Sequence, residues 1–198
     1  PTAASPRYTG PVEIGKSARF RATALREGGE NASYSREFAF SKSTGRPAVL
    51  NTKPNDSYTF EGASLLVDGY HSRPVFTSGA WLGYLDEPLD VTIDMGGEQS
   101  YRSVELETLA EKGDWIFPPS SVTVWVSDNG TDFTEVASVT VPEAKVGDAD
   151  GIGRYRMQFP ETSARYLKVV AQNAAAIPAW HPGAGSKGFL FVDEVVVE

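Results

Sequence analysis

Leu89-Asp-Val-Thr-Ile-Asp-Met95 and Ser121-Val-Thr-Val-Trp-Val-Ser127 are the two stretches that decide the fold class. Apolar residues fall at every second position, so Leu89, Val91, Ile93 and Met95 share one face of the first stretch, and Val122, Val124 and Val126 share one face of the second. Successive side chains of a β-strand point to opposite faces, so the alternation predicts strands that each turn one face toward a core. Trp125 falls on the opposite face, where we expect it to cover the outside of the sheet or to pack on the N-terminal part of the chain.

Similar short runs fill the rest of the chain, and helical periodicity is almost absent. We expect further extended runs at 18–24, 33–40, 48–50, 62–67, 102–109, 133–139, 154–159, 165–171 and 188–198. Turn signals separate them, notably Gly28-Gly29, Gly96-Gly97 and Asp128-Asn129-Gly130. The Asn-Gly pair suits two successive positive-φ positions of a tight hairpin turn. Many short strands with frequent turns predict an all-β sandwich.

Composition and charge exclude several classes of function. The 198 residues carry a formal net charge of -8, with a sequence pI near 4.9. Nucleic acid binding needs a basic surface, so we expect no nucleic acid partner. No apolar run reaches the roughly 18 residues of a membrane span, so we expect no membrane insertion. The absence of Cys removes disulfides, thiolate nucleophiles and Cys-ligated zinc. A neutral ligand such as a sugar is indifferent to the negative charge.

The chain is expected to hold two parts. Residues 1–45 are too few for a substantial core of their own, and residues 46–198 form the main domain. Ser41–Pro47 has the composition of a linker between them. Because the sequence begins Pro-Thr and shows no signal peptide, we expect it to start inside a longer protein.

The N-terminal residues resemble a known accessory unit. Pro1-Thr-Ala-Ala-Ser-Pro-Arg-Tyr8-Thr-Gly-Pro11, with Ala18-Arg-Phe-Arg-Ala22 and Ala24-Leu-Arg-Glu-Gly28 after it, is similar to the fibronectin-like unit that follows the catalytic barrel of bacterial chitobiases and β-hexosaminidases. The Asp-Gly that opens the family pattern is missing. The resemblance therefore implies a truncated immunoglobulin- or fibronectin-like β unit.

The main domain resembles the F5/8 type C, or discoidin, family. Its landmarks appear in order: Leu66-Val-Asp68-Gly69, Trp81-Leu-Gly83, Val91-x-Ile93-Asp94-x-Gly96, Val124-x-Val126-Ser127-Asp128-x-Gly130-x-x-Phe133 and Ala164-Arg165-Tyr166-Leu-Lys-Val169. Carbohydrate-binding module family 32 belongs to the same group. The closing Trp180–Gly185 and Phe191–Val195 segments resemble the tails of Bacteroidetes family 20 hexosaminidases. The resemblance implies a discoidin-like jelly-roll sandwich, and with it a non-catalytic accessory domain of an exported bacterial β-hexosaminidase or chitobiase.

Catalysis within this chain is not expected. A glycosidase needs two carboxyl groups about 5–10 Å apart across a sugar-sized cleft. Asp193 and Glu194 are adjacent in a predicted strand, so their side chains should point to opposite faces. A catalytic barrel would also need roughly 250 residues of its own. We therefore assign no catalytic residues.

Three of the four long irregular segments carry the candidate binding residues. Tyr70–Gly79, Glu111–Ser120 and Gln172–Lys187 hold aromatic and basic side chains, whereas Pro142–Gly153 reads as a solvent loop. The sugar-binding candidates are His71, Arg73, Lys112, Trp115, Asn173, Trp180, His181 and Lys187. Trp115 and Trp180 are the best platforms for stacking on a sugar ring, because each lies in a polar loop. Two alternatives stay open: both Trp side chains could be loop plugs, with Trp115 packed on His181, and His181 could be a structural residue. Trp81, beside a strand, is expected in the core.

The family resemblance also implies a structural calcium ion. It places Asp68, the loop carbonyls that follow it, and Glu194 at that site. Calcium takes six to eight oxygen ligands, so carbonyls would have to complete the shell. The alternative is that Asp68-Gly69 is only a turn and Glu194 a solvated strand residue. The segment Tyr70–Ala80 is longer and less regular than the family pattern, so transferred geometry there carries less weight.

Two functions are consistent with these observations. The first is binding of neutral or amino-sugar glycans, which would hold the catalytic domain of the parent enzyme near its polysaccharide. The second is a purely structural part, which buttresses that catalytic domain or mediates its dimerisation without a sugar site.

Overall fold

Two units share the chain. The computed structural model describes residues 1–2, 4–25 and 32–198, divided into Pro1–Phe40 and Ser41–Glu198. Ser41–Pro47 therefore belongs to the second unit and is not a free linker. Ser43 is fully buried there and donates its hydroxyl hydrogen to the Val195 carbonyl at 2.5 Å. The Gly45 N–H donates to the Val67 carbonyl at 2.7 Å, so this turn is tied to the sandwich at two points.

The first unit contains one antiparallel strand pair. β1 (Ala18–Ala24) runs against β2 (Ala32–Phe38), with Ala18 opposite Phe38 and Ala24 opposite Ala32. The Gly28-Gly29 turn predicted between them lies outside the described residues. Most side chains of both strands are exposed. A two-stranded sheet buries too little apolar surface to be stable alone, as the shortness of this unit led us to expect.

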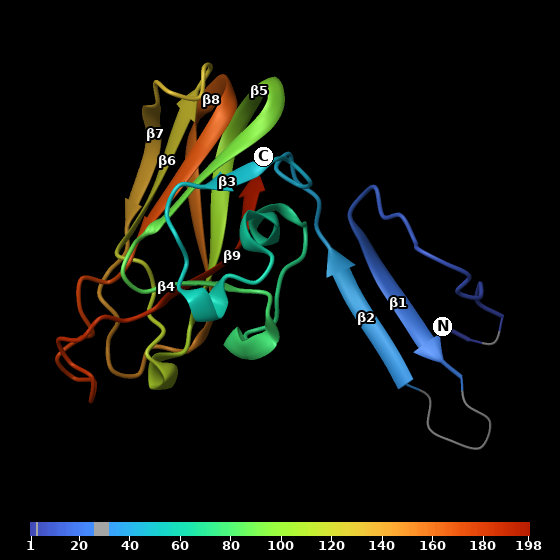
Figure 1. The fold of residues 1–198 in the computed structure, drawn as a ribbon, viewed down its shortest axis with the longest axis horizontal. Helices are drawn as coiled ribbons and strands as arrows, with labels where there is room; N and C mark the ends of the chain where they lie inside the picture. Colours follow the sequence, from blue (N-terminus) through green and yellow to red (C-terminus); the bar gives the residue numbers. More distant parts are fainter. Residues whose placement is uncertain (3, 26–31) are drawn as a thin grey trace. The chain divides into compact units, whose positions relative to one another are not determined.

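The second unit is an antiparallel β-sandwich, as predicted (Figure 1). Its strands are β3 (Ala48–Leu50), β4 (Leu82–Tyr84), β5 (Leu89–Ala110), β6 (Ser121–Ser127), β7 (Thr134–Thr140), β8 (Gly151–Gln172) and β9 (Leu190–Val197). They pair in the order β4-β9-β5-β8-β6-β7, with β3 on β5. Short 3-10 turns lie between them: η1 (Asp56–Tyr58), η2 (Gly62–Val67), η3 (Phe76–Ser78) and η4 (Lys112–Asp114).

Two long bent strands build both layers. We predicted 89–95 and 102–109 as separate strands, and likewise 154–159 and 165–171, but each pair is one strand, β5 or β8. The first half of β5 pairs with β3 and the end of β8, whereas its second half pairs with β9 and the start of β8. The register between β5 and β8 shifts between Asp94 and Gln99, where Gly96 has a φ of +80°. A glycine pair permits a bend within a strand as well as a turn that ends one.

The core lies between these layers. The alternating residues predicted to share a face are buried: Leu89, Val91, Ile93, Met95, Val122, Val124 and Val126. They pack with Leu106, Met157, Val192 and Val195, which come from the other halves of the long strands and from β9. Each such side chain contributes about 1.5–3 kcal/mol when it leaves water. Trp125 is half-buried on the outer face, with the Lys168 ammonium 5.4 Å from its ring centroid.

Two local predictions were wrong. Gly62–Val67 is the 3-10 turn η2, because Leu65, Leu66 and Val67 are all buried, and three successive apolar residues do not distinguish a buried strand from a helical turn. The Asn129-Gly130 turn does not have two positive φ angles, since only Gly130 does. Instead, the Asn129 side-chain oxygen accepts hydrogen bonds from the N–H groups of Thr131 and Asp132, both at 2.9 Å.

Gly83 should tolerate no side chain. A Cβ atom at this position would lie 2.9 Å from both Phe191 Cζ and Tyr58 Cβ. We expect Gly83→Ala to lower the free energy of unfolding by about 1–3 kcal/mol, the usual cost of overpacking, measured by urea denaturation. Gly97→Ala is the matched control, because nothing lies within 4 Å of its added Cβ. Equal stability of the two variants would contradict this packing.

Candidate functional site

The loops at one end of the sandwich form the candidate site. β5 ends at Ala110 beside the first residue of β8, Gly151, so the 111–120 connection starts where the 141–150 connection ends. The Ser120 N–H donates to the Gln172 carbonyl at 2.8 Å, which brings the start of the 173–189 connection to the same place. Backbone bonds from Phe117 N–H to Phe189 O (2.9 Å) and from Phe189 N–H to Trp115 O (2.8 Å) then fix the loops to each other.

Trp115 and Trp180 both pack against the ring of His181. The Trp115 and His181 ring centroids are 6.0 Å apart and the Trp180 and His181 centroids 5.6 Å, both in edge-to-face geometry. Trp115 is 42% exposed and Trp180 is 38% exposed. Each ring therefore packs on the protein on one side and offers part of its surface to solvent. Trp115 also has a left-handed backbone, with a φ of +64°, which is costly for a bulky residue.

His181 and Lys112 hold the loops rather than face solvent. His181 is buried, its Nε2 is 2.9 Å from the Lys112 carbonyl, and its Nδ1 accepts from the Gly183 N–H at 3.0 Å. These partners assign the neutral tautomer protonated at Nε2. The buried Lys112 ammonium pairs with the Asp150 carboxylate, and this bond lowers the pKa of Asp150. This geometry corresponds to the structural alternative for His181.

The other four sugar-binding candidates make their polar contacts with residues other than Trp115 and Trp180. His71 Nδ1 is 2.9 Å from Glu107 Oε2, and this contact raises the pKa of His71. The Arg73 side chain is exposed, and its carbonyl accepts from the indole N–H of Trp81, which is fully buried as predicted. Two further candidates fix the turn after β4. The Asn173 amide donates to the carbonyls of Tyr84 and Leu85, and Lys187 pairs with Asp86 at 2.6 Å.

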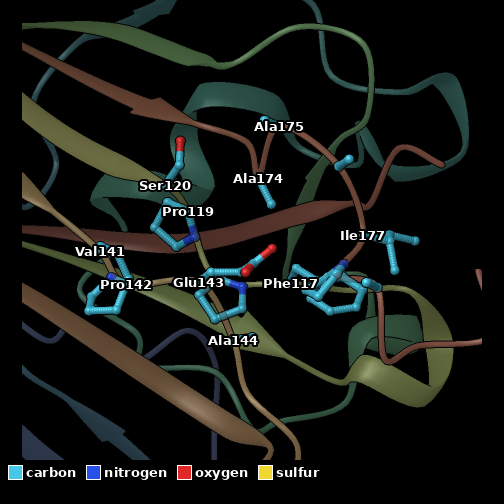
Figure 2. Close-up of a pocket in the computed structure, with 14 residues that line it drawn as sticks. Phe117, Pro119, Ser120, Val141, Pro142, Glu143, Ala144, Ala174, Ala175 and Ile177 are labelled. Carbon is cyan, nitrogen blue, oxygen red and sulfur yellow. The ribbon is translucent and has the colours of Figure 1, made fainter. Parts of the chain in front are cut away.

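A cavity of about 320 Å³ opens beside Trp180 (Figure 2). It lies between three loop segments, 117–120, 141–144 and 174–179. The Trp180 indole donates to the Ala144 carbonyl at 2.9 Å, and its ring centroid is 6.4 Å from that of Phe117. Sequence reasoning missed this cavity and treated Pro142–Gly153 as a solvent loop. The Pro118-Pro119 pair and the Ala174–Ala176 run were the available signals, because rigid and small residues leave room between loops.

Two acidic residues are buried side by side in β9. Asp193 and Glu194 oppose the single residue Glu107, because the β5–β9 register shifts there. This bulge buries both side chains, so our expectation of opposite faces fails at this point, and Glu194 is not a solvated strand residue. Asp193 accepts from the Ser72 N–H at 2.7 Å, and both Glu194 oxygens lie 3.3 Å from the Gly69 nitrogen.

Burial is the largest cause of the pKa shift of the Asp193 and Glu194 carboxyl groups. It raises the pKa of Asp193 to about 8 and the pKa of Glu194 to about 10, from ordinary values of 3.8 and 4.5. The nearby charge of Asp68 adds to both shifts. Asp68 itself accepts from the Tyr70 N–H at 2.7 Å, which places it at the same edge of the sandwich. Among the described residues, no three His, Asp or Glu side chains are arranged to hold one metal ion.

Comparisons with known proteins identify the family. Residues 51–187 match the model of the F5/8 type C domain, so the chain belongs to the F5/8 type C domain family. No curated protein matches the sequence. No helix in the described part of the chain has the length and apolar character needed to cross a bilayer.

Solved structures with the same fold include three sugar-binding modules. Chitosan-binding module 1 of a chitosanase/glucanase from Paenibacillus sp. IK-5 has 18% identity and a TM-score of 0.51, covering 80% of this chain and 98% of that one. Chitosan-binding module 2 of the same enzyme, in complex with chitotriose, has 17% identity and a TM-score of 0.51, covering 79% and 98%. CpGH89CBM32-5 from Clostridium perfringens, in complex with GalNAc-β-1,3-galactose, has 16% identity and a TM-score of 0.50, covering 76% and 93%. At these identities the likeness establishes the sandwich fold alone.

The buried acids should make stability fall as pH rises. The folded protein keeps Asp193 and Glu194 protonated where the unfolded chain has already lost those protons, so their contribution is complete below about pH 4 and declines toward pH 8. With metal ions chelated, we expect a fall of at most about 1.4 kcal/mol per pH unit for each group, measured by urea denaturation. Asp193→Asn should flatten the profile between pH 5 and pH 8. A wild-type profile parallel to that of the variant would show that Asp193 ionises normally.

Proposed function

We propose that Ser41–Glu198 is a non-catalytic module that binds glycans through the loop end that carries Trp115 and Trp180. The observation that carries this proposal is a pair of partly exposed indoles at this loop end, with a sugar-sized, mainly apolar cavity beside Trp180. Sugar sites combine aromatic faces for the C–H surfaces with a few placed polar groups. The similar modules from Paenibacillus and Clostridium perfringens, which bind chitosan, chitotriose and GalNAc-β-1,3-galactose, support this assignment.

We further propose that the module serves an exported bacterial enzyme of the β-hexosaminidase or chitobiase type. The support is the resemblance of Pro1–Pro11 and of the C-terminal segments to that enzyme family. In this proposal residues 1–40 are a fibronectin-like unit that connects the module to the catalytic domain. A weak sugar site then works by raising the effective concentration of the enzyme at its polysaccharide.

A structural role is the rival proposal, and one observation favours it. The ring nitrogens of His181, the ammonium groups of Lys112 and Lys187, and the side-chain NH2 group of Asn173 are already engaged within the protein. A module of this kind would pack its loop end on the catalytic domain or on a second copy, and the half-exposed indoles would be buried in that contact.

Sugar titration separates the two roles. We expect saturable changes in Trp fluorescence with one or more of galactose, GalNAc, GlcNAc and chito-oligosaccharides. Trp115→Ala should weaken binding by about tenfold, the scale of one aromatic contact. Trp180→Phe is the matched variant for the other ring, because it keeps an aromatic face while it removes the bond to Ala144 and part of the ring area. A folded protein that responds to none of these sugars, and that sediments as a dimer, would favour the structural role.

We also propose that Asp68 and Glu194 contribute to a structural calcium site. The residues fit this ion in chemistry, since their carboxyl oxygens are the kind of ligand that calcium takes, and in position, since Glu194 is buried close to Asp68 and Asp193. Two carboxylates are not a complete shell, so carbonyls of the loop after Asp68 would have to supply most of the ligands. A bound divalent ion would offset the repulsion between the acids and tie η2 to β9.

Chelation tests the calcium proposal. We expect EGTA to lower the melting temperature of the wild-type protein and added calcium to restore it, because an ion that binds only the folded state stabilises that state. Glu194→Gln keeps the size of the side chain and should abolish the response. Glu161→Gln, on the exposed bend of β8, is the control and should respond like the wild type. Identical melting with and without EGTA would argue against a bound ion.

A further inference from the structure

The cavity beside Trp180 combines apolar walls with a carboxylate. Its lining consists mainly of proline and alanine: Pro118, Pro119, Pro142, Pro178, Ala144, Ala174, Ala175, Ala176 and Ala179. Phe117 and Ile177, both buried, also face it. In Figure 2 the Glu143 carboxylate points from its loop across the cavity toward Ala174. The volume of about 320 Å³ suits one sugar residue with a small substituent.

Donors and acceptors remain available around this space. Within the described residues, the Glu143 carboxylate has neither an ion pair nor a hydrogen bond. In the same part of the chain, no hydrogen bond uses the backbone N–H groups of Ala174, Ala175 and Ala176. The Ser120 hydroxyl, in contrast, is engaged, since it donates to the Asn173 carbonyl at 2.9 Å. The cavity thus offers a free acceptor, free donors and a methyl-sized apolar surface together.

We propose that this cavity recognises the 2-acetamido group of an N-acetylated amino sugar. An acetamido group has an amide N–H for Glu143, a carbonyl oxygen for the backbone N–H groups of Ala174–Ala176, and a methyl group for the proline and alanine side chains. The inference rests on the proposed glycan-binding function and deepens it, because it states which substituent of the glycan is read and where.

The other substituents of a sugar use less of this lining. A hydroxyl group leaves the apolar walls without a partner. A free ammonium group pairs with the exposed Glu143 carboxylate alone and leaves the apolar walls without a partner. The acetamido group is neutral and has a partner for the Glu143 carboxylate, for the backbone N–H groups and for the apolar walls. The cavity should therefore prefer it over a hydroxyl group and over an ammonium group.

Three trisaccharides of similar size provide the test, titrated calorimetrically into the complete 198-residue chain. These are N-acetylchitotriose, its deacetylated form chitotriose, and cellotriose. We expect N-acetylchitotriose to bind about tenfold more tightly than the other two, the usual discrimination from filling a small apolar pocket. Ala174→Leu, which fills the cavity, should reduce its affinity to that of cellotriose, and Glu143→Gln should weaken it severalfold. Ala149→Leu adds the same bulk to the 141–150 loop at an exposed position outside the lining, so it should change nothing.

The outcomes separate this inference from the function on which it rests. Equal affinities for the three sugars, or a preference for the acetylated one that survives Ala174→Leu, would overturn the acetamido site while leaving glycan binding intact. A preference for chitotriose that disappears in Glu143→Gln would assign the cavity to an ammonium group and also overturn the proposal. Absence of binding to every sugar by the folded protein would refute the proposed function itself. Because Glu143 is exposed, Glu143→Gln keeps the test decisive if Ala174→Leu does not fold.

Discussion

Hydrogen bonding between β5 and β8 is the constraint on which the second unit depends. The two strands pair on both sides of a shared bend, so one antiparallel ladder contributes to both layers of the sandwich. A straight strand of 22 residues would separate its ends by about 70 Å. The bend returns the ends of both strands to one end of the domain, where three connections meet. The loop site therefore follows from the bend, and the core residues of both halves keep it in place.

The sequence contained most of the information on the fold and less of that on the site. Period-two alternation located β6 at its observed bounds, because a strand with one buried face leaves that signature directly, and the predicted bounds of β1 and β3 also match. The same alternation divided β5 in two, because Gly96-Gly97 looks the same whether a strand ends there or bends and continues. It also divided β8, the strand that pairs with both halves of β5. It also misplaced Gly62–Val67, since a short apolar run has no period that separates a strand from a 3-10 turn. These errors occur where the chain bends or becomes irregular, and local pattern carries least information there.

The site was harder to predict because its parts are supplied by loops. Trp115, Trp180 and His181 were recognisable as residues of interest, but only the structure shows that His181 has both ring nitrogens engaged and contacts both indoles. The cavity itself is made of proline and alanine, residues without chemical signatures. Their importance comes from the space that they leave between three segments distant in sequence. Such a space cannot be read from any one segment.

The bond from the Trp180 indole to the Ala144 carbonyl joins two walls of the cavity. A guest that pushes the 141–144 segment away from the 174–180 segment must stretch this link, whereas a slender guest leaves it intact. A change in the width of the cavity opening therefore also changes the surroundings of the Trp180 indole. The optical signal of Trp180 should consequently report how far the 141–144 and 174–180 segments separate, without an added label.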